Sequence, residues 1–277
     1  MKLKAVCVKC KIIFIVLLVI SYLEVEAQKG YEIGGWVGTS VYHGDLNPEI
    51  NFKDPGLSFG LIGRYNFNSR ICFKTSLNYG FIKGNDADSK NNFNRNRNLN
   101  FQSHMIDLSP VIEFNFMDYV HGSRTKYFTP YLLGGANMFY FNPTTELDGE
   151  KYSLRKFGTE GQIAGKEYGL VHFGLVLGVG FKWDINYDYS INIEWSTRLL
   201  FTDYLDDVST VYPDKEGLRA RRGDIAVALS DRSLVEGLGG TDRQRGDSKS
   251  KDSYSLFGIG IVKYFGRIDC PEISKIK

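Results

Sequence analysis

Eight segments of alternating apolar and polar residues follow one another along this sequence after its first 27 residues. In residues 70–82, the most regular of them, one face carries Phe73 and Leu77 and the other carries Lys74. Successive side chains of a strand point to opposite sides, so each segment predicts a β-strand with one apolar and one polar face. A soluble sandwich would also alternate, but charges on the polar face and aromatic residues at the strand ends favour a barrel whose exterior contacts lipid.

The lengths of the connections support the same interpretation. The predicted strands are Tyr31–Tyr42, Gly56–Phe67, Arg70–Ile82, Leu99–Met117, Lys126–Phe141, Tyr168–Ile185, Tyr189–Thr202 and Ser253–Phe265. Short and long connections alternate between them, as in outer-membrane barrels with short periplasmic turns and long outer loops. The sequence therefore predicts an all-β fold, an eight-stranded antiparallel transmembrane β-barrel over residues 28–266, with both termini in the periplasm. The apolar segment Ile225–Leu229 could form a short helix or a further strand, so ten strands are the alternative.

Aromatic residues are expected to form a girdle at each membrane surface. The periplasmic girdle would contain Phe67, Phe73, Phe116, Phe128, Trp183, Tyr189 and Phe265. The outer girdle would contain Phe81, Phe101, Phe141, Tyr168, Phe201 and Tyr254.

The N-terminus has the features of a secretory signal peptide. Basic residues precede the apolar run Ile12–Leu23, and a small residue, Ala27, marks the expected cleavage site. Residues 1–27 hold four Lys and two Glu, so residues 28–277 carry 30 basic and 30 acidic side chains, and nothing indicates a nucleic-acid partner. No later apolar run is long enough for a transmembrane helix, so a membrane location for the mature chain requires a closed barrel.

The polar faces of the strands predict a charged barrel interior. By parity, eight charged side chains point inward: Arg64, Lys74, Asp107, Glu113, Lys182, Asp184, Glu194 and Arg198. Side chains fill an eight-stranded barrel, and buried charges must be paired because each one alone costs several kcal/mol. We therefore expect a balanced ion-pair network rather than an open pore, with a proton path or gated channel as the alternative.

Few residues suggest a chemical site. The four His have no metal-ligand spacing with one another or with Cys, so we expect neither a metal nor a cofactor. His43 and Asp45, with Ser40 nearby, could belong to an outer-membrane lipase, although a turn at the rim of the first strand is the simpler interpretation.

Two polar stretches are interpreted as exposed outer loops. The acidic group in residues 203–207 lacks the spacing of a calcium-binding loop, so we expect a solvated loop. The Asn- and Arg-rich residues 91–98 are expected to form a mobile loop.

Two cysteines, Cys72 and Cys270, follow the predicted cleavage site, in a compartment where disulfides persist. Cys270 belongs to residues 267–277, a predicted periplasmic C-terminal tail beyond the last strand. A cysteine on an exposed tail suggests an intermolecular disulfide. An internal bond to Cys72 and two free thiols are the alternatives.

The chain resembles the PorG family, the outer-membrane barrel of the type IX secretion and gliding machinery of Bacteroidota. The resemblance rests on the Gly-rich first strand with Tyr42–Pro48, on Arg245–Lys249 before the last strand, and on Cys270-Pro271 after it. The long, mixed-charge last loop departs from the family pattern.

This resemblance implies a non-enzymatic protein that anchors a periplasmic ring, built from a lipoprotein and its partner, to the outer membrane. Cys270 and its neighbours Asp269 and Pro271 would then contact the partner. An outer-membrane lipid-modifying enzyme, a small solute channel and an adhesin-like display protein are the alternatives.

Overall fold

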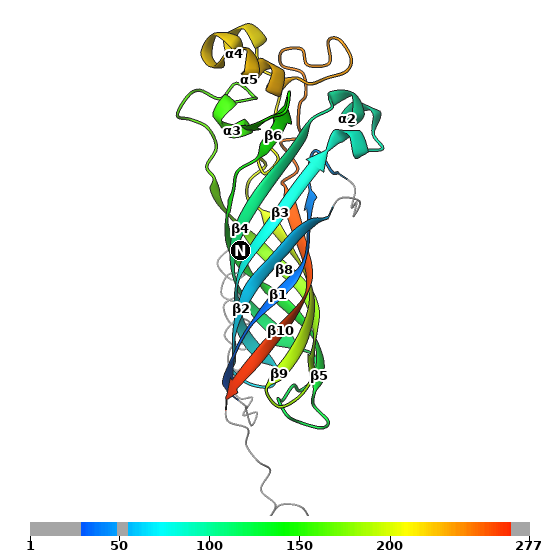
Figure 1. The fold of residues 1–277 in the computed structure, drawn as a ribbon, viewed down its shortest axis with the longest axis vertical. Coiled ribbons are helices and arrows are strands. Elements are labelled where there is room, and N and C mark those ends of the chain that lie inside the picture. Colours follow the sequence, from blue (N-terminus) through cyan, green and yellow to red (C-terminus); the bar gives the residue numbers. More distant parts are fainter. Residues whose placement is uncertain (1–28, 49–54, 267–277) are drawn as a thin grey trace, which may run out of the picture.

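Eight strands close into an antiparallel barrel in the computed structural model, which describes residues 29–48 and 55–266. The strands of the wall are β1 (Gly30–His43), β2 (Gly56–Asn66), β3 (Ile71–Asn85), β4 (Asn100–Asn115), β5 (Phe128–Phe141), β8 (Val171–Asp184), β9 (Tyr189–Leu200) and β10 (Ser253–Gly266). They pair in the order β3-β2-β1-β10-β9-β8-β5-β4, and pairing of β3 with β4 closes the cylinder (Figure 1). The predicted eight-stranded antiparallel barrel is confirmed. The predicted signal peptide and C-terminal tail lie outside the described residues.

Each predicted strand matches a strand of the wall to within three residues at either end. Two further strands, β6 (Thr144–Leu147) and β7 (Glu150–Ser153), form a hairpin that touches the wall through one pair, Gln102 with Thr144. This hairpin lies outside the cylinder, so the barrel has eight strands although ten are present in the described residues. Ile225–Leu229 belongs to a helix, which settles the alternative for that segment.

The long connections fold into an ordered cap at one end of the barrel (Figure 1). Its helical segments are η1 (Asp86–Asp88), α2 (Asn92–Arg97), α3 (Leu154–Phe157), α4 (Lys215–Arg222) and α5 (Asp224–Ser230). In the described residues, none of the helices is long and apolar enough to cross a membrane.

The expectation of a mobile Asn-rich loop is wrong, because residues 92–97 form α2. The Asn91 side chain accepts a hydrogen bond from the Phe93 amide at the start of this helix, and Asn98 ends it in the left-handed conformation, with φ at 59°. Asn favours both positions, since its short polar side chain bonds to nearby backbone. A run that looked like low-complexity sequence therefore contains the signals that begin and end a helix.

The wall is apolar outside and polar inside. Outward side chains such as Leu61, Phe173 and Trp183 are 57–66% exposed. The residues predicted for the periplasmic girdle are exposed or partly exposed. The prediction of the outer girdle is wrong at Phe101, Phe141 and Tyr254, which are buried. These three share the inward parity of Asp107 and Arg198, so they pack in the upper barrel instead of facing outward.

One position interrupts the hydrogen-bonded wall. Pro110 lies in the middle of β4, and the pairing of β4 with β5 stops at Leu108–Met138 and resumes at Val111–Gly135. Proline has no amide hydrogen to donate, so it leaves a gap in a ladder. On its other side Pro110 stays in register with Thr75 of β3.

Candidate functional site: the filled lumen and the outer cap

The lower lumen is organised around Glu113 of β4. Its carboxylate pairs with Arg64 at 2.7 Å, with Lys182 at 2.6 Å and with Lys74 at 3.3 Å. Glu113 and Lys182 have no exposed surface. Lys74 also pairs with Glu194, the carboxylate that accepts a hydrogen bond from Tyr131 at 2.7 Å. These contacts join six strands across the barrel, β2, β3, β4, β5, β8 and β9.

Two members of this network were missed by the sequence analysis. Glu32 of β1 is fully buried and pairs with Arg64. Its parity between the outward Tyr31 and Ile33 was a usable signal. His121 comes from the turn between β4 and β5, where no periodicity applies, so the sequence carried no signal for it.

His121 closes the end of the barrel that carries the short turns. Its Nε2 lies 3.0 Å from Glu32 and its Nδ1 lies 3.1 Å from Asp184, and its ring stacks on Tyr264 at 4.2 Å. Burial alone would lower the pKa of His121, but its hydrogen bonds to Asp184 and Glu32 raise that pKa to about 9. The imidazole is therefore positively charged at neutral pH and supplies the cation that these two carboxylates need.

Higher in the barrel, Asp107 of β4 binds Arg198 of β9 at 3.6 Å. Asp107 also accepts hydrogen bonds from Tyr254 at 2.6 Å and from the amide groups of Asn78 and Asn137. The structure thus places all eight of the predicted inward charges inside the barrel. A cavity of only about 30 Å³, lined by Lys74, Glu194 and Arg198 among others, separates the two charged levels.

Cys72 also lies in the lumen, completely buried. Its sulfur is 3.6 Å from both the Lys182 ammonium and the Asn115 amide nitrogen. Cys270, Asp269 and Pro271 lie outside the described residues, so the disulfide alternatives and the proposed contact stay predictions.

The outer mouth of the barrel is plugged by residues 203–209, which are buried apart from the partly exposed Tyr204. Leu205 and Val208 join an apolar cluster with Tyr42, Phe101 and Phe141. The expectation of a solvated acidic loop is therefore wrong. Burial of the apolar side chains between the aspartates places the whole segment inside the mouth.

Four aspartates in this plug and beside it have raised pKa values. Burial raises the pKa of Asp206 and Asp252 well above the ordinary range, and the Tyr42 hydroxyl hydrogen-bonds to both, at 2.5 Å and 3.2 Å. Burial also raises the pKa of Asp203 and Asp207, each to about 6. The mouth is thus rich in carboxylates that hold protons more tightly than usual.

Two buried arginines hold the cap together. Arg97 of α2 binds Asp86 through two contacts of 2.7 Å and donates to the Arg245 carbonyl at 2.5 Å. Arg245 in turn binds Glu160 at 3.1 Å and donates to the Asp207 carbonyl at 2.6 Å. The cap is therefore linked to the plug through charge-assisted hydrogen bonds, the stronger class of such bonds.

The residues suggested for a lipase do not form a catalytic array. Ser40 donates its hydroxyl to the Phe81 carbonyl at 2.6 Å, and the Asp45 carboxylate accepts from the Asp247 amide at 2.9 Å. The Nε2 atom of His43 lies 3.5 Å from Ser255 instead. A serine nucleophile needs a base within hydrogen-bond reach, and His43 does not supply one to Ser40. Within the described ranges, no cluster of three or more His, Cys, Asp or Glu could hold a metal ion.

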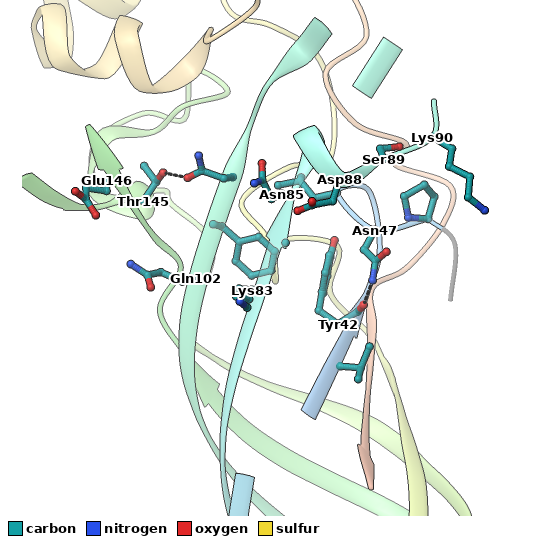
Figure 2. A pocket seen from close by; sticks show the side chains of 16 residues that line it. Tyr42, Asn47, Lys83, Asn85, Asp88, Ser89, Lys90, Gln102, Thr145 and Glu146 are labelled. Carbon is teal, nitrogen blue, oxygen red and sulfur yellow. Dashed lines mark hydrogen bonds between the residues drawn. The ribbon is translucent and has the colours of Figure 1, made fainter. Parts of the chain in front are cut away.

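A hollow of about 440 Å³ opens at the outer end of the β3–β4 hairpin (Figure 2). Lys83 and Gln102 lie at its edge nearest the barrel, and Asn85 and Asp88 lie above them in this view. Glu146 and Thr145 lie at the left in this view, and Ser89 and Lys90 lie at the right.

The fold defines this protein as a small, closed β-barrel whose interior is filled by side chains in the part of the chain described. Residues 10–227 match the family model described as a domain of unknown function (DUF6089). The chain belongs to this family. No curated protein matches it by sequence.

Two solved structures show some likeness to this chain. OprG, an outer membrane protein from Pseudomonas aeruginosa, is 12% identical over 88% of this chain and 99% of its own, with a TM-score of 0.46. Ail, the attachment invasion locus protein of Yersinia pestis solved with a heparin analogue, is 11% identical over 86% of this chain and 99% of its own, with a TM-score of 0.42. Likeness at this level establishes neither a shared activity nor a shared ligand.

Proposed function

We propose that this chain is a non-enzymatic outer-membrane β-barrel. The observation that carries the proposal is a closed eight-stranded cylinder whose outward strand positions are apolar and whose charges point inward. Within lipid every backbone polar group needs a partner, and a closed barrel gives each strand two neighbours. A soluble barrel would have no reason to expose side chains such as Leu61, Phe173 and Ile261 around its whole wall.

The filling of the barrel supports a structural role rather than conduction. Ion pairs occupy the lower lumen, His121 covers one mouth and residues 203–209 occupy the other. Water and solutes would have to displace buried, paired charges to pass, which costs several kcal/mol for each ion.

We further propose that the barrel anchors a periplasmic ring complex of the type IX secretion system. The resemblance to the PorG family supports this finer role. The direction of the chain also supports it, because β10 ends beside the start of β1, with Gly266 paired to Gly30, at the end with short turns. The last described strand therefore ends at that closed end, the end to which the proposal assigns the partner.

Co-purification in mild detergent, with and without reductant, tests both levels of the proposal. We expect a periplasmic lipoprotein to accompany the wild-type barrel and a reducible high-mass band to disappear in Cys270→Ser. Deletion of residues 267–277 should remove the partner, whereas Cys72→Ser, the matched cysteine control, should retain it.

The outcomes separate the two levels. A barrel that inserts into membranes but recovers no periplasmic partner would contradict the anchoring role alone. A mature protein that stays monomeric and compact in buffer without detergent would contradict the membrane location, and the anchoring role with it.

A further inference from the structure

Amide side chains that line the outer hollow are held at one end and free at the other. The Oδ1 atom of Asn85 accepts a hydrogen bond from the Ala87 amide at 3.1 Å, and no described residue bonds to its Nδ2 group. Asn47 is held in the opposite sense, because its Nδ2 group donates to the Tyr42 carbonyl at 2.7 Å and its Oδ1 atom has no partner in the described chain (Figure 2). The hollow therefore presents an amide donor and an amide acceptor whose orientations are already fixed.

Two residues of β4 add to this set. The Oδ1 atom of Asn100 accepts a hydrogen bond from the Thr145 hydroxyl, so Nδ2 is the end left for a ligand. Gln102 is partly exposed, and its side-chain amide has no partner among the described residues. Asp88 and Glu146 are exposed, and neither carboxylate forms an ion pair within the described ranges. The groups of the hollow that remain for a ligand are thus a mixture of neutral donors, neutral acceptors and carboxylates.

The charges of the hollow argue against an anionic ligand. Among the described residues that line it, the cations are Lys83 and Lys90, and both already have interaction partners. An anion would therefore meet the two carboxylates without an uncommitted cation to offset them. The buried Leu46 and Phe101 also line the hollow and contribute apolar surface. Its volume of about 440 Å³ and its few placed polar groups are typical of small-molecule sites.

We propose that this hollow binds an uncharged saccharide at the cell surface. Each sugar hydroxyl donates and accepts hydrogen bonds, so it matches a mixture of amides and carboxylates. The C–H groups of a sugar ring match the apolar surface beside them. Because the amides are fixed before binding, less conformational entropy is lost when the sugar binds. The sugar can belong to a free oligosaccharide or to the neutral headgroup of a glycolipid, since the hollow opens at the outer end of the β3–β4 hairpin. This inference rests on the proposed outer-membrane location.

The test uses the full mature barrel in phosphatidylcholine nanodiscs, with its side-chain amide signals observed by NMR. Maltose, mannobiose and chitobiose serve as free probes, and diglucosyl diacylglycerol in the bilayer serves as the lipid-linked probe. We expect a probe to shift the signals of Asn85 and Asn100, while those of the buried lumenal Asn137 and Asn192 stay unchanged. A shift with a free disaccharide assigns an oligosaccharide, and a shift with the glycolipid alone assigns a lipid headgroup.

Nearly isosteric variants separate recognition from folding. Asn85→Asp and Asn100→Asp remove the free Nδ2 donor but keep the acceptor that holds each side chain. Each should weaken binding about fivefold, the loss expected for one hydrogen bond. Asn186→Asp is the matched control, because Oδ1 of Asn186 accepts from the Asp188 and Tyr189 amides in a turn at the closed end. This control should bind the probe like the wild type.

The other outcomes contradict the proposal at different levels. Equal affinity of the wild type, Asn85→Asp and Asn100→Asp would overturn the assignment to this hollow. Competition by millimolar inorganic phosphate would overturn the uncharged ligand, because it would indicate an anion site. A barrel that inserts into the bilayer but shows no shift with any of these probes would overturn the saccharide site alone. Failure to insert would contradict the membrane location, and the cell-surface sugar with it.

Discussion

Buried carboxylates are stabilised differently at the two ends of the barrel interior. In the lower lumen, Glu113 and its neighbours are matched by cations, and His121 completes the set from a turn. At the outer mouth, aspartates such as Asp206 and Asp252 gather around Tyr42, and the buried arginines lie above them in the cap. Buried carboxylates at the lower end are therefore stabilised by opposite charges, and those at the outer mouth are stabilised by protonation.

This difference predicts different sensitivities. An ion-pair network fails when one partner is removed, because the remaining charge is buried without compensation. A protonated carboxylate cluster fails when pH rises, because like charges then face one another in a dry environment. Three experiments separate the two ends.

The largest effect is expected for Glu113→Gln, which leaves Arg64, Lys74 and Lys182 with one carboxylate fewer. Breaking a buried ion pair from one side costs about 3–5 kcal/mol, and we expect a loss of this size in the free energy of unfolding. Urea titration of the barrel in lipid vesicles measures it. Glu194→Gln is the matched control, because its carboxylate is 23% exposed and pairs with Lys74 alone, so a loss of about 1 kcal/mol is expected. Equal losses in the two variants would show that Glu113 is not the centre of the network.

The next effect concerns pH at the outer mouth. The folded pKa of Asp207 is raised to about 6, above an unfolded value of about 4, so its stabilisation is complete below about pH 4 and is lost as pH rises through 6. A shift of two units corresponds to on the order of 2–3 kcal/mol. Hydrogen exchange in residues 203–209, corrected for the intrinsic rate, should therefore become faster between pH 4.5 and 7.5. Asp207→Asn should flatten this dependence, and faster exchange toward acid pH would contradict the assignment.

The smallest measured effect is expected at the closed lower end, because cleavage there reports only the local opening of one turn. The pKa of His121 is raised to about 9 from an ordinary value of about 6.5, so its contribution is complete below pH 6.5 and is lost as pH rises through 9. Trypsin cleavage after Arg124 or Lys126 should increase between pH 7 and 10, beyond the change seen with a free peptide. His121→Gln should raise the cleavage rate already at pH 7, because the free energy needed to open the turn falls by about 1 kcal/mol. Unchanged cleavage in that variant would show that the turn is held by other contacts.

The wall of this fold could be predicted from sequence because strand parity is a local signal. A period of two residues, repeated between short turns, fixed both the strands and the direction of the eight inward charges. The same parity rule places Glu32 and Phe101 inward, where the structure has them buried. The expectation for Phe101 was wrong because a compositional pattern was given priority over a geometric one.

The cap could not be predicted because its contacts join distant parts of the chain. Arg97 looked like one cation in a polar run, yet it bonds to the Arg245 carbonyl 148 residues away. Burial of Asp206 depends equally on Tyr42, 164 residues earlier. Neither helix signals nor composition carries information about such partners, so charge alone suggested solvent exposure.

Pro110 weakens the pairing of β4 with β5 in the barrel wall. Because Pro110 has no amide hydrogen to donate to β5, the β4–β5 pairing there has fewer hydrogen bonds than its neighbours. When a barrel of this kind is pulled or heated, strands separate first where the fewest hydrogen bonds between them must break together. We therefore expect β4 and β5 to separate first at Pro110. This pairing lies on the side of the barrel opposite the pairing of β1 with β10.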